Sequence, residues 1–131
     1  MRLSFYILPT NYDDTPCLAR WCWCDALFMA PPAWLELGRQ TGDGRYVDFA
    51  IAEFWSTTAF LLDPRENLYY RDSRFFERRD DKGRKLFWSR GNGWVFAGLA
   101  NMLEALPAHH PERARIEKLF SQITIVVREV E

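Results

Sequence analysis

The chain has 131 residues, enough for one domain of ordinary size, and it carries 17 Lys and Arg against 18 Asp and Glu. Its net charge of -1 gives no sign of a surface that binds nucleic acid or an anionic membrane. No apolar run reaches the roughly 20 residues that span a bilayer. Aromatic residues make up 16% of the sequence, which is typical of a large core or of a carbohydrate-binding groove.

Three cysteines, Cys17, Cys22 and Cys24, lie close together near the start of the chain. Their odd number and tight spacing argue against a disulfide framework, so we expect reduced, buried thiols and a cytoplasmic location. A parent protein could equally be periplasmic or secreted. No second cluster supplies further ligands, and His109 and His110 fall in a distant loop, so the sequence predicts neither a metal nor a cofactor.

The first half of the chain predicts a lead-in and two helices. Residues 1–19 lack a helical period and contain two prolines, which favours an extended segment. Asp25 can cap a helix to about residue 40, which Pro31 and Pro32 would kink or restart. Asp43 can cap a second helix over residues 44–62, which is apolar around much of its circumference and needs neighbours on several sides.

The second half predicts two short strands followed by two helices. Residues 68–70 and 85–88 have the composition of strands that flank a charged turn. Residues 94–106 carry an apolar stripe at helical spacing, and a fourth helix starts near residue 111. The helix–loop–helix rhythm recurs twice, which indicates stacked helical hairpins. Their apolar faces exceed what four helices can bury on each other, so we expect part of a larger assembly.

The stretch from Trp88 to Trp94 is the strongest candidate for a binding site. We expect Trp88, Arg90 and Trp94 to surround one concave spot, with Gly91 and Gly93 forming a tight turn between them. Aromatic faces stack on sugar rings, and arginine binds carboxylates in a planar, bidentate way, so an acidic sugar fits this combination. The alternative is that the tryptophans belong to the core and Arg90 is a surface charge.

Two further positions could take part in chemistry. Asp25 follows Trp23-Cys24 and precedes an apolar run, and a carboxyl in apolar surroundings can hold a proton near neutral pH, as a general acid must. Its alternative role is a plain helix cap. Arg71 follows Tyr70 and either reaches the same groove as Arg90 or belongs to a solvated salt-bridge face.

Four blocks in order resemble the unsaturated uronyl hydrolases of glycoside hydrolase family 105, the unsaturated rhamnogalacturonyl hydrolases, with family 88 as close kin. They cover most of the chain from Arg20 onward. The blocks are Trp23-Cys24-Asp25-Ala26-Leu27-Phe28-Met29-Ala30-Pro31-Pro32; Thr41-Gly42-Asp43 with Tyr46-Val47-Asp48-Phe49; Leu68-Tyr69-Tyr70-Arg71-Asp72-Ser73-Arg74-Phe75; and Phe87-Trp88-Ser89-Arg90-Gly91-Asn92-Gly93-Trp94.

The resemblance implies an all-α fold, here a fragment of an (α/α)6 barrel with about two helical hairpins and a short β-hairpin between helices. It implies a glycoside hydrolase that hydrates the double bond of a 4,5-unsaturated uronic acid at the end of an oligosaccharide of the galacturonyl-rhamnose type, as in pectin degradation. An aspartic acid protonates the C4 side of that bond and activates water to attack C5. The hemiketal then rearranges and releases the sugar, without metal or cofactor.

The same resemblance implies roles for individual residues. Asp25 would be the general acid and base, with Trp23 lining its pocket. Trp88 and Trp94 would stack on sugar rings, and Arg90 would bind the uronate or its partner sugar. Arg71 stands where many relatives carry a histidine, and it would also bind the substrate.

The sequence also departs from that family. Residues 1–19 match poorly, so we place the partial barrel domain at residues 20–131. The family's second catalytic-site aspartate and the last barrel helices are not found in this chain. We therefore expect little or no activity from the isolated chain, and self-association through exposed helix faces. The rival hypothesis is a non-catalytic carbohydrate-binding or helical interaction module.

Overall fold

The computed structural model describes residues 21–129, so the predicted lead-in over residues 1–19 lies outside the described part of the chain. Within that part the structure is mostly helical, as the sequence predicts. The helices are α1 (Ala26–Thr41), α2 (Gly44–Leu61), α3 (Ser89–Ala105) and α4 (Arg113–Glu129), with a 3-10 turn η3 (Ser73–Phe75) and a two-stranded antiparallel sheet of β1 (Leu62–Asp63) and β2 (Leu68–Tyr69).

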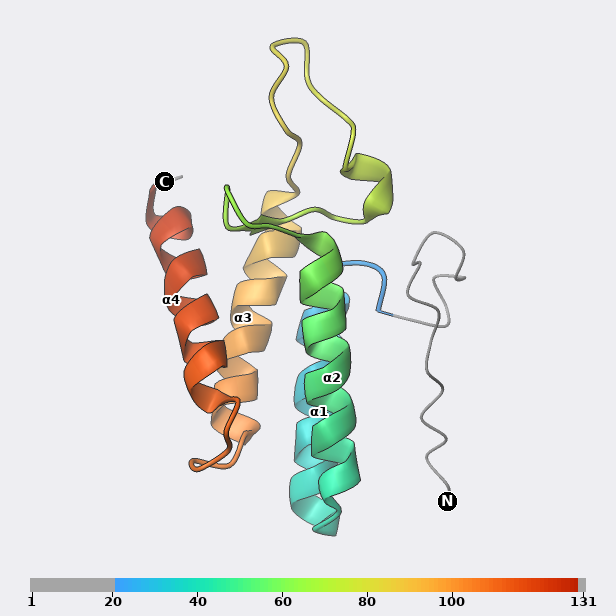
Figure 1. The fold of residues 1–131 in the computed structure, drawn as a ribbon, viewed down its shortest axis with the longest axis vertical. Helices are drawn as coiled ribbons and strands as arrows, with labels where there is room; N and C mark the ends of the chain where they lie inside the picture. The colour runs from blue at the N-terminus through green and yellow to red at the C-terminus, as the bar shows by residue number, and fades with distance from the viewer. Residues whose placement is uncertain (1–20, 130–131) are drawn as a thin grey trace.

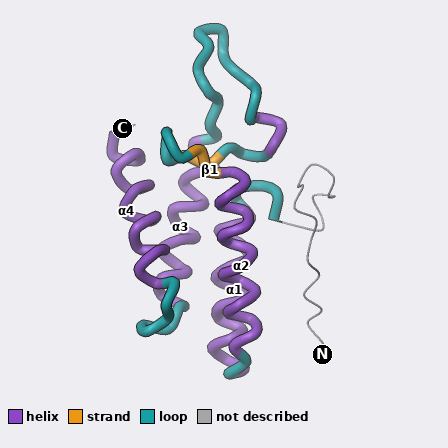
Figure 2. Tube along the Cα trace, in the orientation of Figure 1, coloured by secondary structure: helices purple, strands orange, loops and turns teal. Residues whose placement is uncertain are grey.

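The four helices form two antiparallel hairpins that lie side by side (Figure 1). Helix α1 packs against both α2 and α3, and α3 packs against α4. The strands and the segment between them and α3 lie together at one end of the helices, and this segment projects beyond the helix ends (Figure 2). This end of the molecule therefore brings together segments that are far apart in the sequence.

The apolar stripes predicted for the helices form one core. Its fully buried members include Leu27 and Leu35 of α1, Phe54 of α2 and Leu99 of α3, and Ile116 and Ile123 of α4 extend it. Burial of side chains of this size stabilises the fold by about 1.5–3 kcal/mol each, before the entropy of ordering them is counted.

Helix α1 continues through its two prolines and ends where the sequence predicts. Gly42 adopts a left-handed φ of 70°, and its N–H donates to the carbonyl of Gly38. Pro31 and Pro32 cannot donate to the carbonyls one turn earlier, those of Leu27 and Phe28. The backbone of α3 approaches at this point, because a Cβ on Gly98 would lie 2.3 Å from the Leu27 carbonyl oxygen. The Leu27 carbonyl that Pro31 leaves without its helical partner thus lies against the α3 backbone at Gly98.

The first of the two predicted strands forms, but the prediction of a strand at residues 85–88 is wrong. Strand β2 pairs with β1, with Leu62 opposite Tyr69, whereas residues 86–88 form no strand and Lys85 makes only an isolated bridge with Arg79. The hairpin forms because the Asp63 carboxylate accepts hydrogen bonds from the N–H groups of the turn, and Asn67 closes that turn with a φ of 53°. Residues 76–88 instead form the projecting loop.

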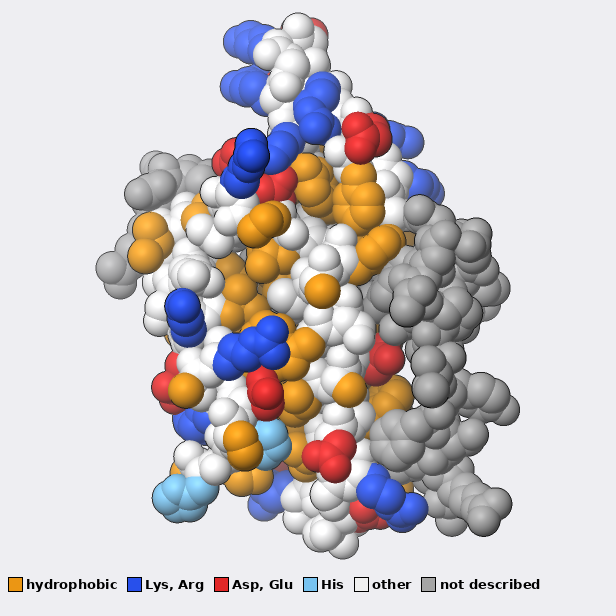
Figure 3. All heavy atoms as spheres, viewed as in Figure 1, with side chains coloured by type: hydrophobic (Ala, Val, Ile, Leu, Met, Phe, Trp, Pro, Cys, Tyr) orange, Lys and Arg blue, Asp and Glu red, His pale blue; other side chains and the backbone are white. Residues whose placement is uncertain are grey.

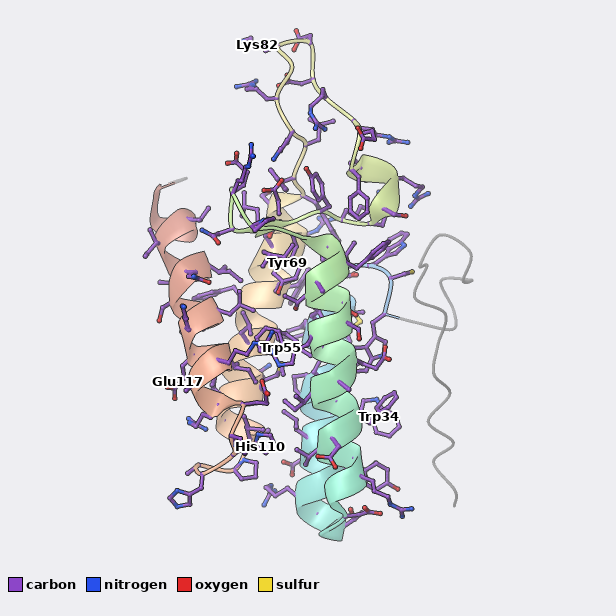
Figure 4. All side chains as sticks on the ribbon, viewed as in Figure 1. Trp34, Trp55, Tyr69, Lys82, His110 and Glu117 are labelled. Atoms are coloured by element: carbon purple, nitrogen blue, oxygen red, sulfur yellow. The ribbon has the colours of Figure 1, made fainter. Side chains whose placement is uncertain are left out.

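Helix α3 begins at Ser89, five residues before the predicted start at Trp94. Neither Gly91 nor Gly93 has a positive φ, so the predicted turn is wrong. Asn92 is buried and does not cap the helix: its side-chain amide donates to the Tyr69 carbonyl at 2.9 Å, and its carbonyl accepts from the Tyr69 N–H at 2.7 Å. These bonds fasten β2 to the first turn of α3, with Tyr69 between the helices (Figure 4).

Trp55 of α2 also connects the two hairpins (Figure 4). Its indole N–H donates to the Glu112 carboxylate at 2.9 Å, and the Arg115 guanidinium lies 3.7 Å from the ring centroid. His110 accepts the Glu112 N–H through Nδ1, which gives this histidine a structural role at the start of α4. None of the described helices is long and apolar enough to cross a membrane.

Candidate active site

A pocket of about 630 Å³ opens at the loop end of the helices. Its walls come from the segment before α1, the turn after β2, the end of the projecting loop and the first turn of α3. The lining residues are Trp23, Arg71, Phe75, Leu86, Phe87, Trp88 and Arg90. Four of the six candidate site residues from the sequence, Trp23, Arg71, Trp88 and Arg90, therefore meet in one place.

Arg71 is the central cation of this pocket. Its guanidinium lies 4.1 Å from the ring centroid of Trp23, and the rings of Phe75 and Trp88 are 5.6 and 6.0 Å away. A guanidinium stacked on an aromatic face keeps its N–H groups at the edge of its plane, where they can bind an anion. Arg71 lines the pocket and also makes a 3.4 Å ion pair with Asp72, whereas Arg74 is exposed and fits the alternative of a solvated salt-bridge face.

Asp72 holds this part of the pocket in shape. Its buried carboxylate accepts from Arg74 at 2.8 and 2.9 Å and lies 3.4 Å from Nε of Arg71. Burial acts to raise the pKa of the Asp72 carboxyl, but the bonds from Arg74 and the charges of Arg74 and Arg71 lower that pKa overall. The Arg71 carbonyl also accepts the Cys24 N–H at 3.0 Å, which ties the turn after β2 to the segment that leads into α1.

Arg90 and Trp88 form the opposite wall. The Arg90 guanidinium lies 5.5 Å from the Trp88 ring centroid. Gly91 permits this wall, because a Cβ there would lie 2.2 Å from Cε3 of Trp88. Gly91 thus allows the backbone of α3 to lie close to an aromatic ring.

Asp25 lies directly before α1 and two residues after Trp23, and it is half-buried. Asp25 occupies the N-cap position of α1, as the sequence predicts, but its side chain makes no cap hydrogen bond. Asp25 is not among the residues that line the pocket. Its charge, after burial, contributes to raising the pKa of the neighbouring Cys24 thiol to about 12.

Trp94 is the other predicted site residue outside the pocket lining. It follows Arg90 by one helical turn and so lies on the same face of α3. Its ring is 40% exposed and packs on Phe28 at a centroid distance of 4.7 Å. Phe28 in turn follows Asp25 by three residues, so Trp94 approaches the Asp25 side of α1.

The cysteines differ from the sequence expectation. Cys22 is disulfide-bonded, whereas Cys24 is a buried free thiol. The expectation of reduced thiols, on which the cytoplasmic location was based, is therefore wrong for Cys22. Among residues 21–129, no group of three or more His, Cys, Asp or Glu side chains is placed to hold a metal ion.

Sequence reasoning missed three of the apolar pocket residues, Phe75, Leu86 and Phe87. Phe75 and Phe87 stand within the family-like blocks, so the blocks themselves carried a signal for them. Leu86 had been assigned to a strand, and its place in the wall depends on the path of the projecting loop, which sequence periodicity does not reveal.

Comparison with known proteins places this site in a family. Residues 13–130 match the sequence model of Glycosyl Hydrolase Family 88, and the chain belongs to that family. It is 43% identical over 106 residues to an unsaturated 3S-rhamnoglycuronyl hydrolase from Alteromonas sp. (strain LOR), a match that covers 81% of this chain and 26% of the relative. It is 38% identical over 117 residues to a protein of the same name from Formosa agariphila, covering 85% and 31%.

Solved structures give the same fold. A family 88 glycosyl hydrolase from Bacteroides vulgatus has a TM-score of 0.78 and 31% identity, and a C. acetobutylicum family 105 glycoside hydrolase has 0.68 and 26%. A structure described as a polysaccharide lyase gives 0.79 and 31%. Each match covers 82% of this chain and 31% of the other. The chain thus has the fold of about a third of a helical barrel of this family.

Proposed function

We propose that this chain carries the general acid and base, and one wall of the sugar-binding site, of a glycoside hydrolase that acts on oligosaccharides ending in a 4,5-unsaturated uronic acid. The observation that supports this proposal most is the pocket where Trp23, Arg71, Trp88 and Arg90 meet. Asp25 follows one of these lining residues, Trp23, by two positions in the sequence. Two relatives named as unsaturated 3S-rhamnoglycuronyl hydrolases support the same class of substrate. In carbohydrate shorthand 3S denotes a 3-sulfate, and a sulfated uronyl-rhamnose unit is therefore part of the proposal.

The proposed chemistry needs one carboxyl that gives and then takes a proton. Protonated Asp25 donates to C4 of the double bond, and the developing positive charge at C5 is attacked by water, whose proton passes to the Asp25 carboxylate. The C5 hydroxyl product is a hemiketal that opens and releases the neighbouring sugar. Because the Asp25 side chain does not bind the first turn of α1, its carboxyl is not committed to capping.

The other residues bind and orient the substrate. Trp23 and Trp88 offer ring faces to the sugar planes, and Arg90 is placed to pair with the uronate carboxylate. Trp94 extends the same face of α3 and would stack on a sugar one turn below Arg90.

The test uses an unsaturated uronyl-rhamnose disaccharide and follows the loss of the ultraviolet absorbance of its double bond. Asp25→Asn keeps the shape of the side chain and removes its acid function, so turnover should fall by at least about a hundredfold, the usual value of general acid–base catalysis. Asp48→Asn is the matched control, because Asp48 is an exposed aspartate on α2, and it should keep the parent rate.

Equal rates for the parent and Asp25→Asn would contradict the role of Asp25. Binding of the disaccharide without turnover in the parent would instead favour the rival function, a non-catalytic carbohydrate-binding module, or an inactive fragment of the hydrolase.

We further propose that the 131-residue chain self-associates when it is alone in solution. Met29 and Leu37 of α1, Trp94 of α3 and Ile125 of α4 are large apolar side chains that the described structure leaves exposed, Met29 to 65%. Such side chains gathered on helix faces favour contact with a second copy.

A further inference from the structure

Among the described residues, two arginines line the pocket, and they carry more positive charge than one uronate carboxylate can neutralise. Arg71 reaches the pocket from the turn after β2, and Arg90 reaches it from the first turn of α3. The Arg71 guanidinium lies over Trp23 and the Arg90 guanidinium over Trp88, whose ring centroid is also 6.0 Å from Arg71. A ligand that satisfies both needs two anionic groups.

Within the described residues, Arg90 has no ion pair, and Arg71 has one long ion pair to a carboxylate that Arg74 also binds. No carboxylate of residues 21–129 lies within ion-pair distance of Arg90, and that part of the chain offers Arg71 only the 3.4 Å contact between its Nε and Asp72. Asp72 is already held by two shorter bonds from Arg74. The Nη groups of Arg71, at the far end of the fork from Nε, therefore remain the stronger candidates for binding an anion of the ligand.

The surroundings of the pocket are positive as well. Residues 71–90 contain eight Arg and Lys against four Asp and Glu. Lys and Arg side chains dominate the loop end of the molecule (Figure 3), with Lys82 at the tip of the projecting loop (Figure 4). This field attracts anionic ligands toward the pocket, which within residues 21–129 is lined by the cations Arg71 and Arg90 alone.

We propose that Arg71 binds a sulfate ester on the sugar next to the unsaturated uronate, while Arg90 binds the uronate carboxylate. The inference rests on the proposed function and adds the residue that distinguishes a sulfated from an unsulfated substrate. A sulfate ester stays ionised at all ordinary pH values and presents several oxygens to the edge of a guanidinium, which suits a cation whose face is covered by Trp23. Arg71 is thus a specificity residue, and Asp25 performs the chemistry.

The experiment measures binding in an Asp25→Asn background, so that turnover does not consume the ligand. Two unsaturated uronyl-rhamnose disaccharides are compared, one with a sulfate on the rhamnose and one without, and binding is followed by calorimetry and by the fluorescence of the pocket tryptophans. Arg71→Gln removes the charge, Arg71→Lys keeps it without the planar fork, and Lys82→Gln removes a charge of the same loop end outside the pocket. Circular dichroism establishes that each variant is folded.

The Asp25→Asn chain should bind the sulfated disaccharide about tenfold or more tightly than the unsulfated one, since a hydrogen bond to a charged group contributes a difference of that size. Arg71→Gln should abolish this preference and leave the affinity for the unsulfated sugar nearly unchanged. Arg71→Lys should keep part of the preference, and Lys82→Gln should keep all of it. The preference should also shrink as salt is added.

Equal affinity for the two sugars, or a preference that survives Arg71→Gln, would overturn the assignment of Arg71 and leave the proposed function standing. Loss of the preference in Arg90→Gln rather than Arg71→Gln would also overturn it. Failure of the folded chain to bind either sugar would contradict the proposed function itself, and the role of Arg71 with it.

Discussion

Gly91 and Trp88 make the contact on which one pocket wall depends. An alanine at residue 91 would place its Cβ 2.2 Å from Cε3 of the indole, so the ring must move. We expect Gly91→Ala to lower the free energy of unfolding by about 1–3 kcal/mol, as overpacking usually does, and to weaken disaccharide binding. Urea unfolding and a binding titration measure the two effects.

Gly93→Ala is the matched control, two residues further along the same helix. No atom lies within 4 Å of the position that its Cβ would take, and its φ is not positive. It should therefore raise the free energy of unfolding by about 0.5–1 kcal/mol, because alanine loses less backbone entropy than glycine. A Gly91→Ala variant that behaved like Gly93→Ala would contradict the tight contact with Trp88.

The residues that make up the site were largely predictable from the sequence, but their arrangement in space was not. Arg71, Trp88 and Arg90 were identified from residue type and spacing, and Trp23 was identified from the family resemblance. The pocket unites all four. The position of Trp94 depends on where α3 starts. Two glycines around Asn92 favoured a loop, but the buried Asn92 amide bonds to Tyr69 across 23 residues of sequence, and no local pattern reports such a bond.

At the scale of elements, Asp63 connects the β-hairpin with the projecting loop. Its buried carboxylate accepts from the Tyr70 hydroxyl and from Lys85, in addition to the N–H groups of its own turn. Burial acts to raise the pKa of Asp63, but Lys85, the two N–H groups and Tyr70 outweigh it and lower that pKa to about 2. Lys85 thereby anchors the loop whose next three residues line the pocket.

This shift predicts a pH dependence of stability. A carboxyl whose pKa is lower in the folded chain stabilises the fold above its unfolded pKa, near 4, and this contribution is lost as the pH falls toward 2. Asp63→Asn should therefore destabilise the chain by about 1–3 kcal/mol at pH 7, where it breaks the bonds to Lys85 and Tyr70. The difference from the parent should narrow between pH 4 and pH 2, as measured by urea unfolding. A difference that does not change over this range would rule out the lowered pKa.

The helices were predictable because each has a long periodic stripe, whereas the strands were not. Residues 85–88 have the composition of a strand but no partner strand among the described residues, and β1 was assigned to the end of the second helix. Strands of two residues carry too little pattern to be recognised, and their pairing follows from the Asp63 turn.

At the scale of the whole molecule, the chain spans 26–31% of the length of the curated relatives it matches. The two hairpins and the loop end nevertheless bring both proposed binding walls together. The all-α class and the hairpin rhythm were predictable from periodicity, while the barrel fold came from the family resemblance, since four helices alone do not specify how many more would follow.

Exposed apolar side chains predict concentration-dependent association of the isolated chain. Met29→Lys places a charge on the most exposed large apolar position of α1, so it should lower the average mass seen by sedimentation. Gln40→Lys adds the same charge at an exposed polar position of α1 and should leave association unchanged. A parent chain that stays monomeric at all concentrations would refute self-association.

The reactivity of the Cys24 thiol can be used to follow local opening of the pocket. It is fully buried, and burial, with the nearby charge of Asp25, raises its pKa to about 12, so the reactive thiolate is scarce in the folded state at neutral pH. Alkylation by iodoacetamide can then proceed only when the segment between Trp23 and α1 separates from the Arg71 turn, to which the Cys24 N–H is bonded. The rate of alkylation therefore reports how often this segment opens. A sugar that binds across the two sides of the pocket should lower that rate.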